Sequence, residues 1–239
     1  MLLDGKTALI TGAGRGIGRG IALAFARVGC DVALSARSVD ELDETARMAQ
    51  ALGRRAVVLP CDVSDAGAVA RMVDDALDAL GAIDILVNNA GYACFKPFED
   101  LSIEEWERTV AVNLNGPFYV TRAVLPSMKA RSSGRIINIS SVSGLKPIVD
   151  QSAYCAAKHG LNGLTKCLAL ELRKYGIGVH AICPGVVDTQ LARENMGHRD
   201  MSDWMTPEDI AHTALYLATL PPRATTDILH IRRFGSEPL

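Results

Sequence analysis

Residues 6–28 read KTALITGAGRGIGRGIALAFARV, which is an apolar run, a glycine-rich turn and an amphipathic stretch in that order. The turn itself is Thr11-Gly12-Ala13-Gly14-Arg15-Gly16-Ile17-Gly18. Glycines permit a tight turn and let the backbone approach a pyrophosphate, and the start of the next helix offers free N–H groups and a partial positive charge. A turn of this kind between a strand and a helix predicts a dinucleotide-binding βαβ unit.

The alternation of short apolar runs with helical stretches continues along the chain. Runs rich in Val and Ile, mostly apolar on both faces as in a sheet covered on both sides, are residues 6–10, 32–36, 56–60, 83–87, 135–139, 178–183 and 228–231. Ser38, Ser102 and Thr206 have the sequence context of helix N-caps. Seven strands alternating with helices predict an α/β fold with a single doubly wound, parallel, seven-stranded sheet and helices on both faces.

The chain has 239 residues and no linker or low-complexity stretch, so we expect one domain over residues 1–239. Hydrophobic residues make up 49% and charged residues 22%, which excludes a disordered protein. A net charge of −2 and 5% aromatic residues argue against nucleic acid or an anionic membrane as partner. Six scattered cysteines and five unclustered histidines indicate no metal site. With no membrane-length apolar run and no signal-peptide core, a soluble cytoplasmic protein is expected.

The end of the second strand bears on the choice of dinucleotide. Leu34-Ser35-Ala36-Arg37-Ser38 holds no carboxylate, whereas an NAD site would place Asp or Glu there for the ribose hydroxyls. Arg37 could grip a 2′-phosphate with its planar guanidinium, and Arg15 in the glycine turn could grip it from the other side. We therefore expect NADP(H) to be preferred over NAD(H). The alternative is that both arginines are solvated surface residues.

Three motifs occur together in this order: the TGxxxGIG turn at Thr11–Gly18, Asn88-Asn89-Ala90-Gly91 after the fourth strand, and Tyr154-Cys155-Ala156-Ala157-Lys158. Ser141 lies 13 residues before Tyr154. With these motifs the chain resembles the short-chain dehydrogenase/reductase family, from about Gly5 to the last strand. The resemblance implies a Rossmann-type fold and an enzyme that reduces a carbonyl to a secondary alcohol, or performs the reverse reaction on a CH–OH donor.

The resemblance implies a catalytic set of Asn113, Ser141, Tyr154 and Lys158. Tyr154 and Lys158 share one face of a helix because they are four residues apart. An ammonium at ~5 Å and an effective dielectric of ~20 would favour the phenolate by about 3 kcal/mol, or about two pKa units, which would suit Tyr154 as general acid/base. Ser141 would donate a hydrogen bond to the substrate oxygen. By resemblance, Lys158 also holds the nicotinamide ribose, and Asn113 holds a water that links Lys158 to solvent. Asn113 is alternatively only a helix-kink residue.

The turn and the resemblance together predict a set of cofactor contacts. By resemblance, Asp62 and Val63 contact the adenine. Asn88 is expected to have a structural role instead. The expected cofactor-binding residues are Gly12, Arg15, Gly16, Ile17, Gly18, Arg37, Asp62, Val63, Asn89, Ala90, Gly91, Tyr154, Lys158, Pro184, Gly185, Val187 and Thr189.

The substrate is less well specified. A short lid is expected at about residues 189–206. The expected pocket, with Phe95, Leu145, Ile148 and Met196 and few fixed charges, favours a fairly apolar carbonyl compound. One alternative is a 3-oxoacyl-(acyl-carrier-protein) reductase of fatty acid synthesis, which the chain also resembles. The basic residues that could dock an acidic carrier are Lys129, Arg131, Arg173 and Lys174, although basic residues also suit helix C-termini.

A second alternative is a catalytically silent NADP(H)-binding regulatory or scaffold protein. The complete catalytic set argues against it, because a binding protein needs no general acid. The chain ends in Ile231–Leu239 without the glycine-rich tail that supports the subunit interface in many members of the family. A homotetramer and a homodimer are therefore both open.

Overall fold

A single parallel sheet of seven strands organises the computed structural model, which describes residues 1–197, 200–221 and 223–239. The strands are β1 (Thr7–Thr11), β2 (Asp31–Ala36), β3 (Ala56–Pro60), β4 (Ile85–Asn88), β5 (Gly134–Ile139), β6 (Ile177–Pro184) and β7 (Ile228–Ile231). Their order across the sheet is β3-β2-β1-β4-β5-β6-β7. The prediction of a doubly wound parallel α/β sheet is confirmed, and all seven predicted strands are present.

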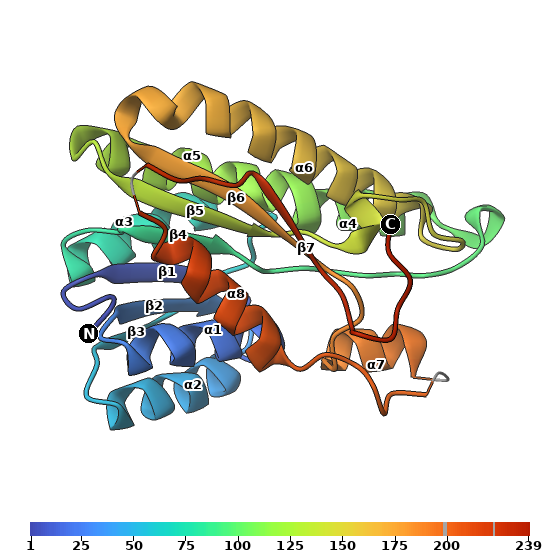
Figure 1. The fold of residues 1–239 in the computed structure, drawn as a ribbon, viewed down its shortest axis with the longest axis horizontal. Helices are drawn as coiled ribbons and strands as arrows, with labels where there is room; N and C mark the ends of the chain where they lie inside the picture. Colours follow the sequence, from blue (N-terminus) through green and yellow to red (C-terminus); the bar gives the residue numbers. More distant parts are fainter. Residues whose placement is uncertain (198–199, 222) are drawn as a thin grey trace.

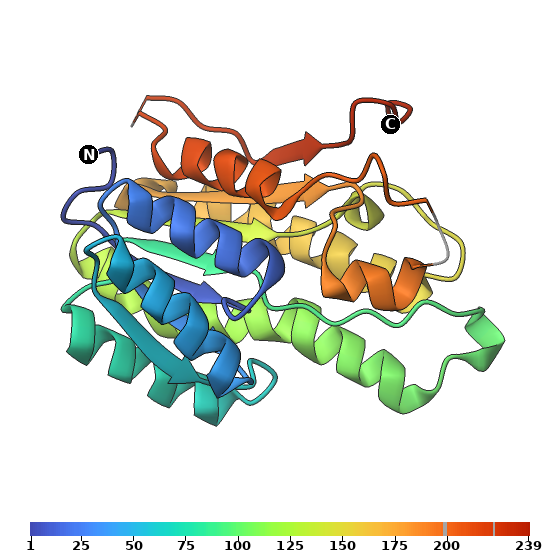
Figure 2. The ribbon, with the colours of Figure 1, turned by 90° about the horizontal axis from the view of Figure 1, so that it is seen from below.

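Helices cover both faces of the sheet (Figure 1). One face carries α1 (Gly16–Arg27), α2 (Val39–Ala51) and α8 (Pro207–Ala218). The other carries α3 (Ala66–Leu80), α5 (Gly116–Ala130) and α6 (Ser152–Leu172), with α4 (Ile103–Val110) packed against α6. The short helix α7 (Gln190–Met196) lies beyond the carboxyl ends of the strands, at the right of Figures 1 and 2. The winding reverses between β1 and β4, and in such sheets ligands bind at that reversal.

The predicted helix starts are confirmed in their hydrogen bonds. The Ser38 hydroxyl accepts the N–H of Glu41 at the start of α2, and the Ser102 hydroxyl accepts the N–H of Glu105 at the start of α4. At the start of α8, Thr206 donates its N–H and hydroxyl to the carboxylate of Asp209. Each contact satisfies a backbone or side-chain group that the first helical turn leaves free.

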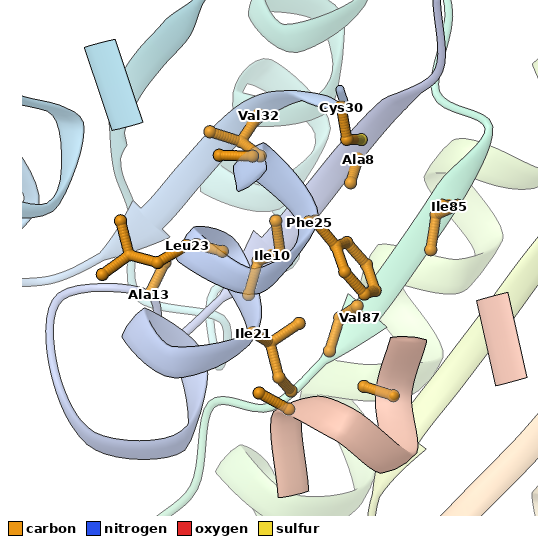
Figure 3. Packing of buried hydrophobic residues seen from close by; sticks show 14 of the residues in the cluster. Ala8, Ile10, Ala13, Ile21, Leu23, Phe25, Cys30, Val32, Ile85 and Val87 are labelled. Carbon is orange, nitrogen blue, oxygen red and sulfur yellow. The ribbon is translucent and has the colours of Figure 1, made fainter. Parts of the chain in front are cut away.

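The larger hydrophobic cluster lies between the sheet and the α1, α2 and α8 layer. Phe25 of α1 is fully buried there, and Figure 3 shows its ring over the sheet, near Ile10 of β1 and Ile85 and Val87 of β4. Because β1 and β4 flank the point where the winding reverses, this packing holds α1 in place over the glycine turn that precedes it.

We predict that Phe25→Ala lowers the free energy of unfolding by about 3–5 kcal/mol, because it leaves a cavity that the surrounding side chains fill only in part. Urea unfolding followed by circular dichroism measures the change. Phe234→Ala is the control, since Phe234 is fully exposed, and we expect it to change stability by less than about 0.5 kcal/mol. Equal losses in the two variants would contradict the packing role of Phe25.

Candidate active site

A cavity of about 730 Å³ opens at the carboxyl ends of the strands. It brings together most of the site residues expected from the sequence, namely Gly12, Arg15, Ile17, Arg37, Asp62, Val63, Asn89, Ala90, Gly91, Ser141, Tyr154, Lys158, Pro184, Gly185, Val187 and Thr189. Gly16, Gly18 and Asn113 do not line it. The volume lies within the usual range for small-molecule and cofactor sites.

The glycine turn forms one end of the cavity. Gly12 has a φ of +64°, and a Cβ there would lie 2.7 Å from the Asn89 side-chain nitrogen. A Cβ at Gly18 would collide with the carbonyl oxygen of Gly12. These two positions therefore require glycine. Arg15 at the N-cap of α1 gives no side-chain cap, and the first turn holds no acidic residue, so the helix start offers its N–H groups to an anion.

The turn is tied to β4 and the residues after it by five hydrogen bonds, one of which the Thr11 hydroxyl donates to the carbonyl oxygen of Val87 at 3.3 Å. The Asn89 side-chain amide donates to the carbonyl oxygens of Thr11 at 3.0 Å and Gly12 at 3.1 Å. The Thr11 hydroxyl in turn accepts the N–H groups of Asn89 at 3.0 Å and Ala90 at 3.1 Å. The glycine turn and the Asn88–Gly91 motif are thus one structural unit, and the Asn89 side chain holds the turn while the residue also lines the cavity.

Asn88 has the structural role that the sequence predicted. It is buried, and its side-chain amide donates to the Thr121 hydroxyl at 3.0 Å and to the Asn138 side-chain oxygen at 2.9 Å. Asn138 then donates to the Thr165 hydroxyl at 2.9 Å. This buried chain of hydrogen bonds connects β4 and β5 with α5 and α6, so it fixes the helix that carries Tyr154.

A carboxylate from the start of α2 reaches the cavity, and the sequence prediction missed it. Arg37 is exposed and lines the cavity as expected, but the Arg15 guanidinium lies 2.9 Å from the Glu41 carboxylate, which also lines the cavity. Glu41 lies in the first turn of α2, three residues past Leu34–Ser38. Arg15 is therefore already paired, and Arg37 is the arginine available to a phosphate.

Asp62, at the end of β3, is held by an arginine that no sequence motif signalled. Arg108 of α4 donates to its carboxylate at 2.8 Å, and Ser64 donates both its N–H and its hydroxyl. Burial acts to raise the pKa of Asp62, but these hydrogen bonds outweigh it and lower the pKa to about 2. Asp62 is thus a fixed negative charge in the wall of the cavity.

Ser141, Tyr154 and Lys158 meet on the far side of the cavity. The Ser141 hydroxyl contacts the N–H of Ser143 at 3.1 Å and its hydroxyl at 3.2 Å, and the Ser143 hydroxyl donates to the buried Gln151 at 2.7 Å. The Tyr154 ring packs edge-on against Phe95, with ring centres 5.4 Å apart. The position of the Ser141 hydroxyl is therefore set by its own loop.

The expected effect of Lys158 on Tyr154 is wrong in this structure. Burial raises the pKa of Tyr154 to about 12, and the hydrogen bond with Ser141 only partly opposes it. The Lys158 ammonium lies 5.5 Å from the centre of the Tyr154 ring and donates to the carbonyl oxygen of Ile139 at 2.8 Å. Burial also lowers the pKa of Lys158 to about 8. Desolvation is thus the largest cause of both shifts, and each shift favours the neutral form of its group.

Asn113 lies behind the cavity, in a π-helical turn between α4 and α5 (Ala111–Asn115). Its side chain is fully buried, and its amide donates to the carbonyl oxygens of Tyr92 at 2.7 Å and Thr109 at 2.9 Å. The side-chain oxygen accepts the N–H of Tyr92. Asn113 therefore shapes the loop after β4, which agrees with the structural alternative considered for it.

The loop after β6 lines the cavity. The Gly185 N–H donates to the carbonyl oxygen of Ile231 at 2.7 Å, and Val187 pairs with Met205. The Thr189 hydroxyl caps α7 by accepting the N–H of Ala192 at 3.2 Å. The expected lid at about residues 189–206 contains α7, but its positions 198 and 199 lie outside the described residues.

The chain after β7 also returns to the cavity. We call residues 232–239 the C-terminal tail. Arg232, Arg233, Ser236 and Glu237 of this tail line the cavity, together with Lys146 from the loop after β5 and His230 from β7. The expectation of a pocket with few fixed charges is therefore wrong. No sequence motif placed the tail there, because this proximity arises only when β7 joins the sheet beside β6.

A metal-binding cluster and a membrane-spanning helix are both absent from the described residues, which are 1–197, 200–221 and 223–239. Among them, no three or more His, Cys, Asp or Glu side chains are grouped so that they could hold a metal ion. Within residues 1–197, 200–221 and 223–239, no helix combines the length and the apolar character that a membrane crossing needs.

Comparison with known proteins agrees with this geometry. Residues 6–200 match the family described as short chain dehydrogenase. The D-beta-hydroxybutyrate dehydrogenase of Rhizobium meliloti (strain 1021) is 38% identical over 212 residues, which are 88% of this chain and 82% of that protein. The D-beta-hydroxybutyrate dehydrogenase of Cupriavidus necator is 40% identical over 221 residues, which are 92% of this chain and 85% of that protein.

A solved structure matches nearly the whole chain. It is a metagenomic short-chain oxidoreductase in complex with NADP, with a TM-score of 0.86 and 36% identity, and the match covers 99% of this chain and 100% of that one. The family match spans well over half of the chain and includes every strand up to β6. The chain therefore belongs to the short-chain dehydrogenase/reductase family and is an oxidoreductase that acts on CH–OH donors or the corresponding carbonyl compounds.

Proposed function

We propose that this protein is an NADP(H)-dependent reductase of carbonyl compounds to secondary alcohols, and catalyses the reverse reaction, with Tyr154 as general acid/base. The observation that carries the proposal is that Ser141, Tyr154 and Lys158 face the same cavity as the glycine turn. The turn fits a pyrophosphate, because it leads into the start of α1, where no side chain caps the helix and no acidic residue lies in the first turn. A bound nicotinamide would supply the hydride.

Tyr154 is suited to give a proton to the carbonyl oxygen. With a pKa raised to about 12 by burial, its phenol is protonated at neutral pH. Ser141 donates a hydrogen bond to the same oxygen and stabilises the negative charge that develops there. In the direction of reduction, the carbonyl carbon gains the hydride and its oxygen gains the Tyr154 proton.

Lys158 is proposed to hold the nicotinamide ribose and to return a proton to Tyr154. Its pKa, lowered to about 8 by burial, leaves the ammonium charged at neutral pH but able to release its proton. The contact with the Ile139 carbonyl keeps the ammonium below the Tyr154 ring. We retain a water held near Asn113 as the proposed link from Lys158 to solvent.

The preference for NADP(H) rests on Arg37. This side chain is exposed at the cavity and makes no ion pair with any residue that the structure describes. Glu41 opposes the preference, because its carboxylate pairs with Arg15 and would repel a phosphate. A single free arginine still supplies planar, charge-assisted hydrogen bonds to a 2′-phosphate. The solved relative bound to NADP agrees with this choice.

A small carbonyl compound is the proposed substrate. The related dehydrogenases named for D-beta-hydroxybutyrate act, by their names, on a secondary alcohol. Docking of an acyl carrier through the four basic residues is disfavoured by their position at the amino ends of β5 and β6. The eight residues of β6 span roughly 26 Å between that end and the cavity. Arg131 is also paired with Asp84.

We further propose that the chain works as one domain in the cytoplasm and as a homo-oligomer. Exposed apolar side chains, namely Ile103 and Trp106 of α4, Phe118 of α5 and Leu170 of α6, support association of subunits. Light scattering coupled to gel filtration distinguishes a monomer, a dimer and a tetramer.

Tyr154→Phe is expected to lower kcat at least about 100-fold and to change NADPH affinity less than about threefold, because it removes the transferable proton and little else. Oxidation of NADPH with a panel of ketones, followed at the nicotinamide absorbance, measures the rate. Tyr216→Phe is the control, since Tyr216 is an exposed residue of α8. Rates within tenfold of the wild type for Tyr154→Phe would refute the acid/base role, and a wild type inactive on every ketone would refute the proposed function.

Lys158→Met should raise the free energy of unfolding at pH 7, because it removes a buried ammonium while keeping a side chain of similar length. The pKa of Lys158 is about 8 in the folded chain and about 10.4 when unfolded. Between these values the unfolded state binds more protons, so the wild type gains stability as pH rises. The advantage of the variant should therefore shrink from pH 8 to pH 10. Urea unfolding at each pH measures it.

Lys166→Met is the matched control, since Lys166 is exposed on the same helix, and it should show no such pH-dependent difference. A Lys158→Met protein that is less stable than the wild type at pH 7, or whose difference is the same at every pH, would contradict the desolvation of Lys158.

Wild-type kcat/KM should favour NADPH over NADH by ten- to a few hundred-fold, because a charge-assisted hydrogen bond contributes about 1.5–3 kcal/mol. Arg37→Ala should remove most of this preference and leave NADH nearly unchanged. Glu41→Gln should increase the preference several-fold, since it frees Arg15 and removes a negative charge. Steady-state kinetics with both cofactors checks all three proteins. A wild type that prefers NADH would show that Arg37 is only a surface charge.

A further inference from the structure

Three basic residues line the cavity, namely Lys146, His230 and Arg232, and we call them the basic wall. None of these residues takes part in the chemistry proposed above. They come from different parts of the chain: Lys146 from the loop between β5 and α6, His230 from β7, and Arg232 from the C-terminal tail. Figure 2 shows this tail, in dark red, continuing past β7 at the end of the sheet where α7 lies.

The alternation of side chains in β7 places His230 on the catalytic face. Leu229 and Ile231 pack against the cluster under α1 and α8, so His230 points to the opposite face, which α6 covers. In register, His230 lies beside Cys183 of β6, whose thiol contacts the Asn162 side chain of α6 at 3.7 Å. The wall therefore stands on the same side of the sheet as the helix that carries Tyr154.

The three members of the wall line the same cavity, and two of them act electrostatically on the third. Burial is the largest cause that lowers the pKa of His230, and the positive charges of Arg232 and then Lys146 lower it further. These causes all favour the neutral form of His230. Its Nε2 atom is buried and has no hydrogen-bond partner among the residues that the structure describes. Buried polar atoms are normally hydrogen-bonded, so this nitrogen is a polar atom whose partner the described residues do not supply.

The charge of the wall is not neutralised locally. The cavity carboxylates Glu41 and Asp62 are paired at the dinucleotide end, with Arg15 and Arg108 respectively. In the tail, Arg233 is paired with Asp203.

By contrast, Arg232 and Lys146 form no ion pair within residues 1–197, 200–221 and 223–239. Arg232 gives one N–H to the carbonyl oxygen of Ser236, which leaves most of its donors free. Glu237 of the tail also lines the cavity, and it forms no ion pair with Arg232 or Lys146 within the part of the chain that the structure describes.

We propose that Arg232 and Lys146 bind a carboxylate of the substrate, so that the enzyme interconverts oxo acids and hydroxy acids. The inference rests on the proposed function, because it names the substrate class of the same site. His230 adds a neutral hydrogen bond to the same carboxylate. A guanidinium is well suited to this role, since it binds a carboxylate through two parallel N–H groups. Arg232 is thus a specificity-determining residue that the tail contributes.

The test compares matched substrates that differ in one charge. We would measure kcat and KM with NADPH for 2-, 3- and 4-oxopentanoate and for their methyl esters. The wild type should prefer at least one oxo acid to its own ester by tenfold or more in kcat/KM. Arg232→Gln should lower kcat/KM for that acid 10- to 100-fold, mainly through KM, and should change the value for the ester less than threefold. Lys146→Gln should act in the same direction and less strongly.

Arg233→Gln is the matched control, because it alters the next residue of the tail and removes the pair with Asp203. If Arg232→Gln acted only by loosening the tail, Arg233→Gln would lower kcat/KM by the same factor. In both variants the decrease in kcat/KM would then be equal for the oxo acid and for its methyl ester. That result overturns the inference, and so does a wild type that favours esters or shows no preference.

A further arm uses acetoacetyl-coenzyme A, whose anionic groups are phosphates. A loss with Arg232→Gln confined to this thioester would show that the wall binds a phosphate and would overturn the carboxylate assignment. Failure of the inference is distinct from failure of the proposed function, because an enzyme that reduces the esters with NADPH but ignores the carboxylate is still a carbonyl reductase.

Discussion

The hydrogen bonds between the glycine turn and the end of β4 are the constraint on which the site depends. The Asn89 side chain holds the carbonyl oxygens of Thr11 and Gly12, and the Thr11 hydroxyl holds the N–H groups of Asn89 and Ala90. They join β1 to β4, where the winding of the sheet reverses. A dinucleotide site at this reversal needs both loops in fixed positions, and backbone hydrogen bonds of the sheet alone do not reach beyond the strand ends.

Burial, more than charge attraction, sets the electrostatics of the catalytic residues. Both Tyr154 and Lys158 lie on α6. Desolvation raises the pKa of Tyr154 and lowers the pKa of Lys158, so it favours the neutral form of each group. This disfavours a resting phenolate and favours a phenol that is ready to give its proton. The buried hydrogen bonds from Asn88 to Thr165 fix the same helix. The region thus combines a hydrogen-bonded frame with two ionisable groups whose charged forms are destabilised by burial. Functional sites commonly lower the stability of the folded protein in this way.

The two halves of the cavity differ in how their charges are handled. At the dinucleotide end, Asp62 and Glu41 are each paired with an arginine, and Arg37 remains available. At the substrate end, Arg232 and Lys146 carry charge that no described ion pair neutralises. A cavity with this distribution favours anions at both ends, a 2′-phosphate at one and, by our inference, a carboxylate at the other. The tail is therefore part of the site.

The sequence by itself predicted the fold correctly and indicated the proposed catalytic set, because those features are local. Seven apolar runs, the helix caps and the i, i+4 spacing of Tyr154 and Lys158 follow from neighbouring residues, and the glycine turn is decided by positions such as Gly12 where a side chain would clash. Tertiary structure alone decided which charges meet. Arg15 forms an ion pair with Glu41 of the next helix, and Arg232 lies at the cavity only because β7 pairs with β6. It also decided the pKa values, since burial depends on everything packed around a group and leaves no short-range pattern in the sequence.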